Sequence, residues 1–142
     1  MILPDVNLLI FATDYNSEFH DVAAQWLETI LSREQVFFSW HTITGFLRII
    51  TNPTASSNPL TIETAVGVVD EWLRLDNTHL VSIEKKNWPL FSTILINGQA
   101  TGNLVMDAHI AAIAASCGAT VATTDRDFSR FTGIKTYNPI KK

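Results

Sequence analysis

Apolar residues along the chain follow two spacings, one typical of helices and one typical of buried strands. Between residues 18 and 31 they recur at helical intervals, which predicts a helix with one buried face. Short runs of β-branched and aromatic residues, such as VFFSW at 36–40, predict strands instead. The pattern predicts helices at 8–13, 18–31, 42–50, 61–75, 86–96 and 105–117, and strands at 1–4, 36–40, 79–83, 119–124 and 134–139.

Asparagine, proline and glycine separate these segments. Asn52-Pro53 ends the helix at 42–50, because the residue before a proline disfavours helical geometry. Gly118 directly follows the last long helix, in the place of a glycine C-cap. Strands and helices therefore alternate along the chain, which predicts a single α/β domain over residues 1–142 with a mainly parallel sheet.

The composition narrows the class of protein. Hydrophobic residues make up 46% of the chain, and the formal net charge is −4. A mildly acidic chain is not a general polyanion binder, because such affinity comes from neutralised phosphates, so any contact with nucleic acid must be local and assisted by a cation. The single cysteine, Cys117, excludes a disulfide within the chain and favours a reducing compartment. With no leader pattern and no long apolar run, we expect a cytoplasmic protein without a membrane segment.

Aspartates follow two of the predicted strands and begin one predicted helix. Asp5 stands at the end of the first strand, and Asp125 and Asp127 come just past the fourth. Sites in parallel sheets form outside the carboxyl ends of the strands, so these side chains converge if the two strands are neighbours. Asp107 lies in the first turn of its helix, on the same stripe as apolar residues that face the core.

Carboxylates that converge in this way need compensation. Two of them ~4 Å apart repel by about 4 kcal/mol at an effective dielectric constant of ~20, a large share of the stability of a small domain. A shared cation removes this repulsion, and a site built from oxygen atoms selects Mg²⁺ or Mn²⁺. Taken singly, each aspartate also fits an ordinary role as a turn former, a helix cap or a helix charge. The histidines show no zinc spacing and are not expected to be ligands: His20, His41, His79 and His109.

Three longer segments together resemble the PIN domain, and more narrowly the VapC-type ribonuclease toxins of toxin–antitoxin pairs. They are DVNLLIFA at 5–12, SWHTITGFLRIITNP at 39–53 and NLVMDAHIAAIAASCGATVATTDRDFSRFTGIKTYNP at 103–139. The resemblance implies a three-layer α/β sandwich with a parallel sheet of about five strands. It also implies a metal-dependent endoribonuclease, and a homodimer that a cognate antitoxin protein holds inactive.

The resemblance assigns roles to particular acids. Asp5, Asp107 and Asp125 match the catalytic and metal-binding aspartates of the family, and Asp127 is an adjacent fourth metal ligand. The implied cofactor is Mg²⁺, with Mn²⁺ as its alternative.

Polar and basic residues complete the expected site. Asn7 and Thr123 match polar positions that lie beside the acids in the family. The family commonly carries a further glutamate on the third helix, where this chain has Gly45. The glycine leaves space through which Arg48, one turn further along, reaches toward a phosphate, and Arg126 is a second candidate for that contact.

Three other functions stay open. A receiver-type signalling domain needs an aspartate at the end of the third strand, where this chain has Ser82-Ile83-Glu84, and a lysine after the fifth. A phosphohydrolase with an Asp-x-Asp motif needs an acid where this chain has Asn7. The third is a catalytically silent PIN-like module that binds RNA or a protein, which Mn²⁺ binding would distinguish from the enzyme.

Overall fold

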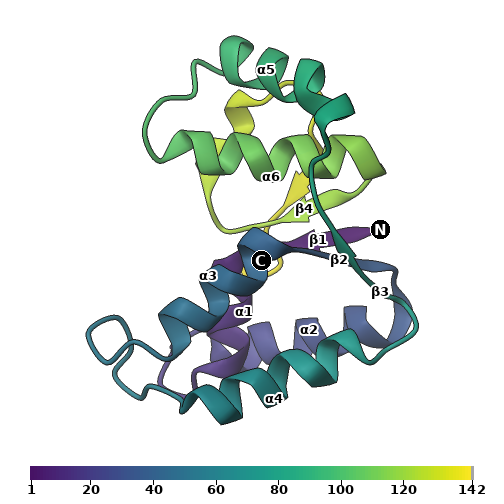
Figure 1. Ribbon diagram of the computed structural model, residues 1–142. Coiled ribbons are helices and arrows are strands. Elements are labelled where there is room, and N and C mark those ends of the chain that lie inside the picture. The colour runs from purple at the N-terminus through teal and green to yellow at the C-terminus, as the bar shows by residue number, and fades with distance from the viewer. Residues whose placement is uncertain (142) are drawn as a thin grey trace.

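The protein, as a computed structural model that describes residues 1–141, is a parallel sheet covered by helices on both faces (Figure 1). The strands are β1 (Ile2–Pro4), β2 (Val36–Ser39), β3 (Thr78–Val81), β4 (Thr120–Ala122) and β5 (Thr136–Tyr137). The helices are α1 (Val6–Thr13), α2 (His20–Arg33), α3 (Trp40–Ile50), α4 (Ile62–Leu73), α5 (Trp88–Asn97) and α6 (Leu104–Cys117), with the 3₁₀ turns η1 (Lys85–Asn87) and η2 (Arg126–Arg130). The expected three-layer α/β sandwich with five parallel strands is therefore confirmed.

The strands lie in the order β3-β2-β1-β4-β5. The chain builds outward from β1 to β2 and β3 on one side, and then returns to place β4 and β5 on the other. The strand order thus reverses between β1 and β4, which is where ligand sites form in open α/β sheets. These two strands are paired in register, with Leu3 opposite Val121 and Pro4 opposite Ala122.

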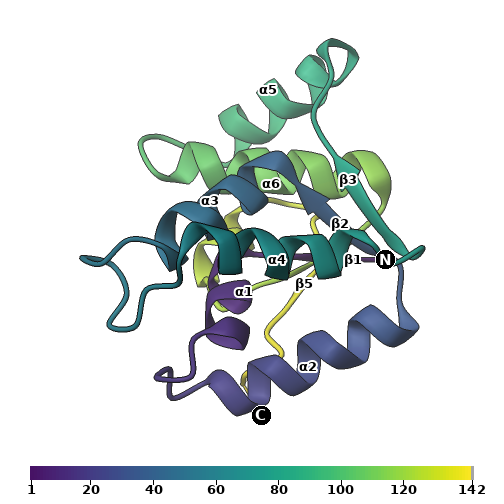
Figure 2. The same ribbon diagram turned by 60° about the horizontal axis from the view of Figure 1, so that its bottom comes forward.

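Two apolar cores lie on the two faces of the sheet. Helices α5 and α6 cover one face, and α1 to α4 cover the other (Figures 1 and 2). Side chains alternate between the cores along β2, since Phe37 packs against the α5–α6 side while Val36 and Phe38 pack against the opposite side. Helix α6 is buried over consecutive residues because it lies between the sheet and α5.

Side-chain caps fix where two of the helices begin. The carboxylate of Asp5 accepts a hydrogen bond from the backbone N–H of Val6 (2.8 Å) and caps α1. The hydroxyl of Ser39 accepts from the N–H of Thr42 (3.0 Å) and caps α3. These caps explain two boundary errors in our predictions: α1 begins earlier than residue 8, and Trp40, expected in a strand, is the first residue of α3.

Three other predicted boundaries differ from the structure. The helix expected at 86–96 is divided into η1 and α5, and the strand expected at 119–124 ends at Ala122. The last strand, expected at 134–139, has only two residues. In residues 1–141 no helix combines the length and the apolar character that crossing a membrane requires.

Candidate active site

Three predicted aspartates come together at the edge of the sheet formed by the carboxyl ends of β1 and β4. One carboxylate oxygen from each of Asp107, Asp125 and Asp127 lies within 4.8 Å of the others. Asp107 comes from the first turn of α6, and the other two come from the turn that follows β4. Helix packing and strand order thus bring together residues that are far apart in the sequence.

Asp5 lies beside this group of three and is not a member of it. Its backbone N–H donates to the carbonyl of Ala122 (2.8 Å), which ties the end of β1 to the end of β4. Its two carboxylate oxygens accept hydrogen bonds, one from the N–H of Val6 and one from the hydroxyl of Thr123 (each 2.8 Å). The carboxylate of Asp5 therefore faces the turn after β4.

Thr123 connects Asp5 to the group of three. Besides donating to Asp5, its hydroxyl accepts a hydrogen bond from the backbone N–H of Asp125 (3.0 Å). Asp125 in turn accepts from the backbone N–H of Asp127 (2.8 Å) through its carboxylate. This chain of bonds fixes the turn in the conformation that holds Asp125 and Asp127 near Asp107.

The electrostatics of the site show that the carboxylates are crowded. Burial, together with the charges of Asp125, Asp5 and Asp127, raises the pKa of Asp107 from 3.8 to about 6, and Arg130 opposes the rise. Burial also raises the pKa of Asp5, against the hydrogen bonds from Thr123 and Val6. The raised pKa values of Asp107 and Asp5 show that ionising these two carboxyl groups is unfavourable without a nearby positive charge.

The donor set fits a hard divalent cation. The group of three offers only carboxylate oxygens, which are the ligands that Mg²⁺, Mn²⁺ and Ca²⁺ prefer. A cation would also offset the burial and the neighbouring negative charges that raise the pKa of Asp107. The residues present therefore fit the metal that the sequence predicted, with Asp107, Asp125 and Asp127 as the side chains placed to hold it.

The predicted polar residues around the acids differ in position. Thr123 is buried at the centre of the site, whereas the side chains of Asn7, Arg48 and Arg126 are exposed. Neither Asn7 nor Arg48 makes a side-chain hydrogen bond within residues 1–141. At Gly45, an added Cβ would contact Cγ2 of Val6 at 3.4 Å, so the backbone of α3 lies close to the start of α1.

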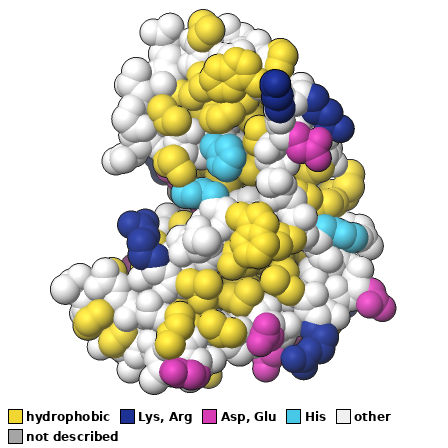
Figure 3. Space-filling view, in the orientation of Figure 1, with side chains coloured by type: hydrophobic (Ala, Val, Ile, Leu, Met, Phe, Trp, Pro, Cys, Tyr) yellow, Lys and Arg dark blue, Asp and Glu magenta, His cyan; other side chains and the backbone are white. Residues whose placement is uncertain are grey.

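Two histidines, which our sequence analysis did not expect to be metal ligands, lie near the acids. The rings of His41 on α3 and His109 on α6 are 6.0 Å apart, and the His109 ring also lies 5.6 Å from that of Phe91. Burial and the neighbouring His41 lower the pKa of His109, while His41 counteracts the raised pKa of Asp5. Figure 3 shows histidine side chains gathered between the upper and lower parts of the molecule. The sequence carries no signal of this meeting, because residues two apart on a helix, such as Asp107 and His109, do not face each other.

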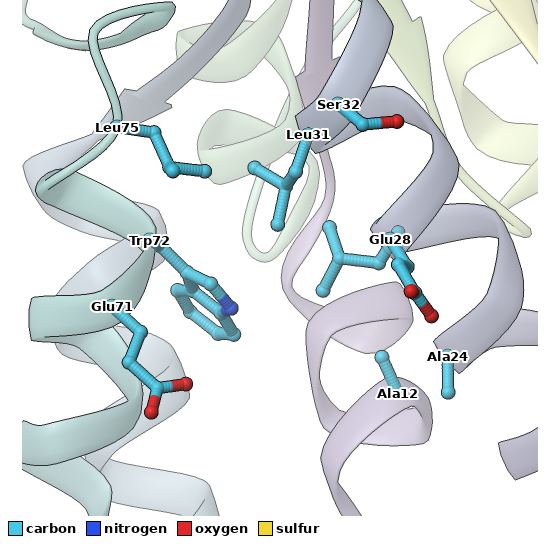
Figure 4. A pocket seen from close by; sticks show the side chains of 9 residues that line it. Ala12, Ala24, Glu28, Leu31, Ser32, Glu71, Trp72 and Leu75 are labelled. Carbon is cyan, nitrogen blue, oxygen red and sulfur yellow. The ribbon is translucent and has the colours of Figure 1, made fainter.

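A larger hollow lies elsewhere. It is an apolar groove of about 430 Å³ between α2 and α4, shown in Figure 4. We call it the α2–α4 groove; its lining residues are Ala12, Ala24, Leu27, Glu28, Leu31, Ser32, Glu71, Trp72 and Leu75. Neither the group of three nor Asp5 lines it, so the groove is not part of the acidic site.

Known proteins resemble the chain along its whole length. Residues 2–134 match the family described as PIN domain. Ribonuclease VapC48 of Mycobacterium tuberculosis is 34% identical over 137 residues, which cover 95% of this chain and 94% of that protein. Ribonuclease VapC37 of the same organism is 32% identical over 140 residues, covering 98% of this chain and 97% of that protein.

A solved structure agrees with this assignment at the level of the fold. VapBC2 from Rickettsia felis, bound to a DNA fragment from its promoter, contains a chain that matches with a TM-score of 0.70 and 17% identity, over 97% of this chain and 98% of that one. The strand order, the carboxylates at the β1–β4 edge and the relatives all agree: the chain belongs to the PIN-domain family and, within it, to the VapC ribonucleases.

Proposed function

We propose that this chain is a metal-dependent endoribonuclease, the toxin of a toxin–antitoxin pair. The observation that carries the proposal is the group of three carboxylates within 4.8 Å at the β1–β4 edge. The substrate class follows the names of its relatives, VapC48 and VapC37, both ribonucleases. The cation we propose is Mg²⁺, with Mn²⁺ as a substitute, since both accept carboxylate oxygens.

The proposed reaction is hydrolysis of a phosphodiester. A water oxygen forms a new bond to phosphorus, one P–O ester bond breaks, and the proton that the water loses is balanced by one gained at the leaving oxygen. A bound divalent cation would stabilise the negative charge that develops on the phosphate oxygens and favour deprotonation of water.

The side chains divide this work. Asp107, Asp125 and Asp127 hold the cation, and Asp125 also orients the attacking water. Asp5 and Thr123 position Asp125, because the Thr123 hydroxyl joins the Asp5 carboxylate to the Asp125 backbone. In this proposal Asp5 completes the set of acids, either as a further ligand or through an ordered water, as Mg²⁺ sites often allow.

The partner we propose is an antitoxin protein that docks in the α2–α4 groove. The groove is apolar along its floor, and Glu28 and Glu71 lie at its edges, while no lysine or arginine lines it. These features suit an apolar helix with basic flanks. Leu75, which is 40% exposed in the free chain, would be covered in such a complex.

We also propose that the chain forms a homodimer. Trp40 at the start of α3 and Trp88 at the start of α5 are each 58% exposed, which is unusual for tryptophan in a monomer. A homodimer that buries them would account for this exposure, and sedimentation of the purified chain would measure its mass.

The test of the activity is cleavage of RNA by purified protein with Mg²⁺ or Mn²⁺, and again with excess chelator. We expect the wild type to cleave only with the metal, and Asp107→Asn to lose cleavage. Asp76→Asn, which removes an exposed carboxylate from the turn before β3, is the matched control and should cleave normally. If all three proteins cleave equally, or if the chelator changes nothing, the proposal is wrong. If the wild type binds Mn²⁺ weakly or not at all and cleaves nothing, the silent PIN-like module is the better account.

A further inference from the structure

A polar notch lies at the carboxyl ends of β4 and β5, next to the turn that carries Asp125. It has a volume of about 180 Å³. We call it the β4–β5 notch; its lining residues are Thr123, Thr124, Asp125, Arg126, Thr136, Tyr137, Asn138 and Lys141. It is far smaller than the pockets that hold whole small-molecule ligands, which measure about 300–1,000 Å³, so it suits a fragment of a larger molecule.

The charges of the notch favour an anion. Two cationic side chains, Arg126 and Lys141, stand against a single carboxylate, that of Asp125. Over residues 1–141 the one salt bridge joins Lys86 to Glu84, so neither cation of the notch is paired with an acid. The side chains that line the notch therefore carry a net charge of +1, in a chain whose formal net charge is −4.

The uncharged side chains of the notch add hydrogen-bond donors. The hydroxyls of Thr124 and Thr136 make no hydrogen bond with other described residues. The side-chain oxygen Oδ1 of Asn138 accepts hydrogen bonds from the backbone N–H groups of Ile140 (2.9 Å) and Lys141 (3.2 Å). These two bonds fold the chain after β5 back over the notch and leave the amide N–H₂ of Asn138 available as a donor.

Tyr137 lines the notch, and its side chain is held in place by contacts with α2. Its hydroxyl accepts a hydrogen bond from the indole N–H of Trp26 on α2 (3.0 Å), and the two rings meet edge to face with centroids 6.4 Å apart. Figure 2 shows the C-terminal segment passing down beside α2, in agreement with this contact. The side chain of Tyr137 is therefore fixed against α2 in the free protein.

Asp125 belongs to both the notch and the group of three carboxylates. A phosphodiester strand whose reacting phosphate lies at the carboxylates must leave the site past neighbouring residues. On the β5 side, those residues are the cations and donors of the notch. We infer that the β4–β5 notch binds a backbone phosphate of the RNA strand next to the phosphate that is cleaved, with Lys141 and Arg126 as its charged contacts. This inference rests on the proposed endoribonuclease function.

The experiment measures binding of a fluorescently labelled single-stranded RNA by fluorescence anisotropy over a series of salt concentrations, together with KM and kcat for its cleavage. Lys141→Ala is the main variant, because Lys141 is remote in sequence from the metal-binding acids. Lys141→Arg keeps the charge, and Lys135→Ala removes an equal charge from the loop before the opposite end of β5.

We expect Lys141→Ala to weaken RNA binding and raise KM, with kcat unchanged. Each lost phosphate contact should reduce the slope of log affinity against log salt by about 0.7, the value for single strands, so the double variant with Arg126→Ala should lose about 1.4. Lys141→Arg and Lys135→Ala should keep the wild-type slope. A wild-type slope and KM in Lys141→Ala would overturn the inference.

The two proposals fail in different ways. If the wild type cleaves RNA and the notch variants bind and cleave as it does, the notch inference is wrong and the endoribonuclease stands. If the wild type binds RNA through the notch cations without cleaving it, the notch is supported and the catalytic proposal is wrong. If the wild type neither binds nor cleaves RNA, both are wrong.

Discussion

Two regions of this molecule are candidates for function, the α2–α4 groove and the β1–β4 edge of the sheet, and they differ in size, polarity and charge. The α2–α4 groove is the larger hollow, at about 430 Å³, and its floor is made of aliphatic side chains and Trp72. The β1–β4 edge borders the smaller β4–β5 notch, of about 180 Å³, yet it gathers three carboxylates within 4.8 Å and raises the pKa of Asp107 to about 6. Cavity size therefore does not locate the chemistry in this fold.

The origin of the two regions explains the difference. The edge is a product of strand order, since β1 and β4 are neighbours at the point where the strand order reverses. The groove is a product of helix packing, where α2 and α4 leave apolar surface uncovered. Changes at the edge should affect catalysis more than folding, and changes in the groove should affect folding or partner binding more than catalysis.

The largest expected effect on folding comes from Trp72→Ala below the groove. Trp72 is 6% exposed and stacks on Phe38 with ring centroids 5.6 Å apart, while Phe46 lies at 4.8 Å. Removing it should cost about 3–5 kcal/mol of the free energy of unfolding, measured by urea titration. Protein that circular dichroism shows to be folded should still cleave RNA. Loss of cleavage in fully folded protein would mean that the two regions are not separate.

Asp125→Asn should have the largest effect on activity. Removing a group that only supports a metal ligand costs about 10- to 100-fold, so removing a ligand should cost at least the upper end of that range in cleavage rate. Leu75→Glu, on the rim of the groove, is the counterpart: it should cleave at the wild-type rate and weaken inhibition by the antitoxin. The separation disappears if the first variant stays active or the second becomes inactive.

Thr123→Val tests the link between Asp5 and the group of three, and its expected effect is of intermediate size. The valine leaves the Asp5 carboxylate and the Asp125 N–H without their shared partner. We expect cleavage to fall by about 10- to 100-fold, and unfolding free energy to fall by about 1–3 kcal/mol. Thr120→Val, at the other end of β4, makes the same chemical change away from the acids and should alter neither quantity.

The smallest effect concerns the stability of the metal-free protein as pH changes. In the folded chain the pKa of Asp107 is about 6, above its ordinary 3.8, so the folded state holds this proton more tightly than the unfolded state. Ionising Asp107 therefore lowers stability as pH rises from about 4 through about 6. In chelator at pH 8, Asp107→Asn should melt higher than the wild type by roughly 2–4 °C, corresponding to about 1 kcal/mol for this partly exposed group.

Comparing the two proteins isolates Asp107 from other titrating groups. The advantage of Asp107→Asn should shrink as pH falls through about 6, because the wild-type carboxyl is then protonated. The lowered pKa of His109 acts in both proteins and cancels in the difference. A melting difference that is constant from pH 4 to pH 8, measured by scanning calorimetry, would show that burial and the neighbouring acids do not raise the pKa of Asp107.

Much of this arrangement is predictable from the sequence, because it depends on local patterns. Apolar spacing predicted all five strands and the helices between them, and Gly118 ends α6 in the left-handed conformation, with φ of 71°, as its position indicated. The carboxyl-end rule for parallel sheets placed Asp5 and Asp125 at one edge. The resemblance to the PIN domain implied the same number, about five strands, and the three-layer arrangement.

What the sequence could not predict depends on individual side-chain contacts. We expected Asp5, Asp107 and Asp125 as the metal-binding acids, with Asp127 as an adjacent fourth ligand; in the structure the group of three is Asp107, Asp125 and Asp127, and Asp5 lies beside it. Asp5 is committed to capping α1 and to Thr123, a contact across 118 positions in the sequence. The same limit hid the meeting of His41 with His109, since α3 and α6 approach each other only in the folded chain.

The central claim is that the strand-end carboxylates share one divalent ion, and calorimetric titration with Mn²⁺ tests it most directly. We expect the wild type and Asp76→Asn to bind with the same affinity, and Asp107→Asn and Asp125→Asn each to bind at least about tenfold more weakly. Equal Mn²⁺ affinity in all four proteins, or no binding by the wild type, would contradict the account.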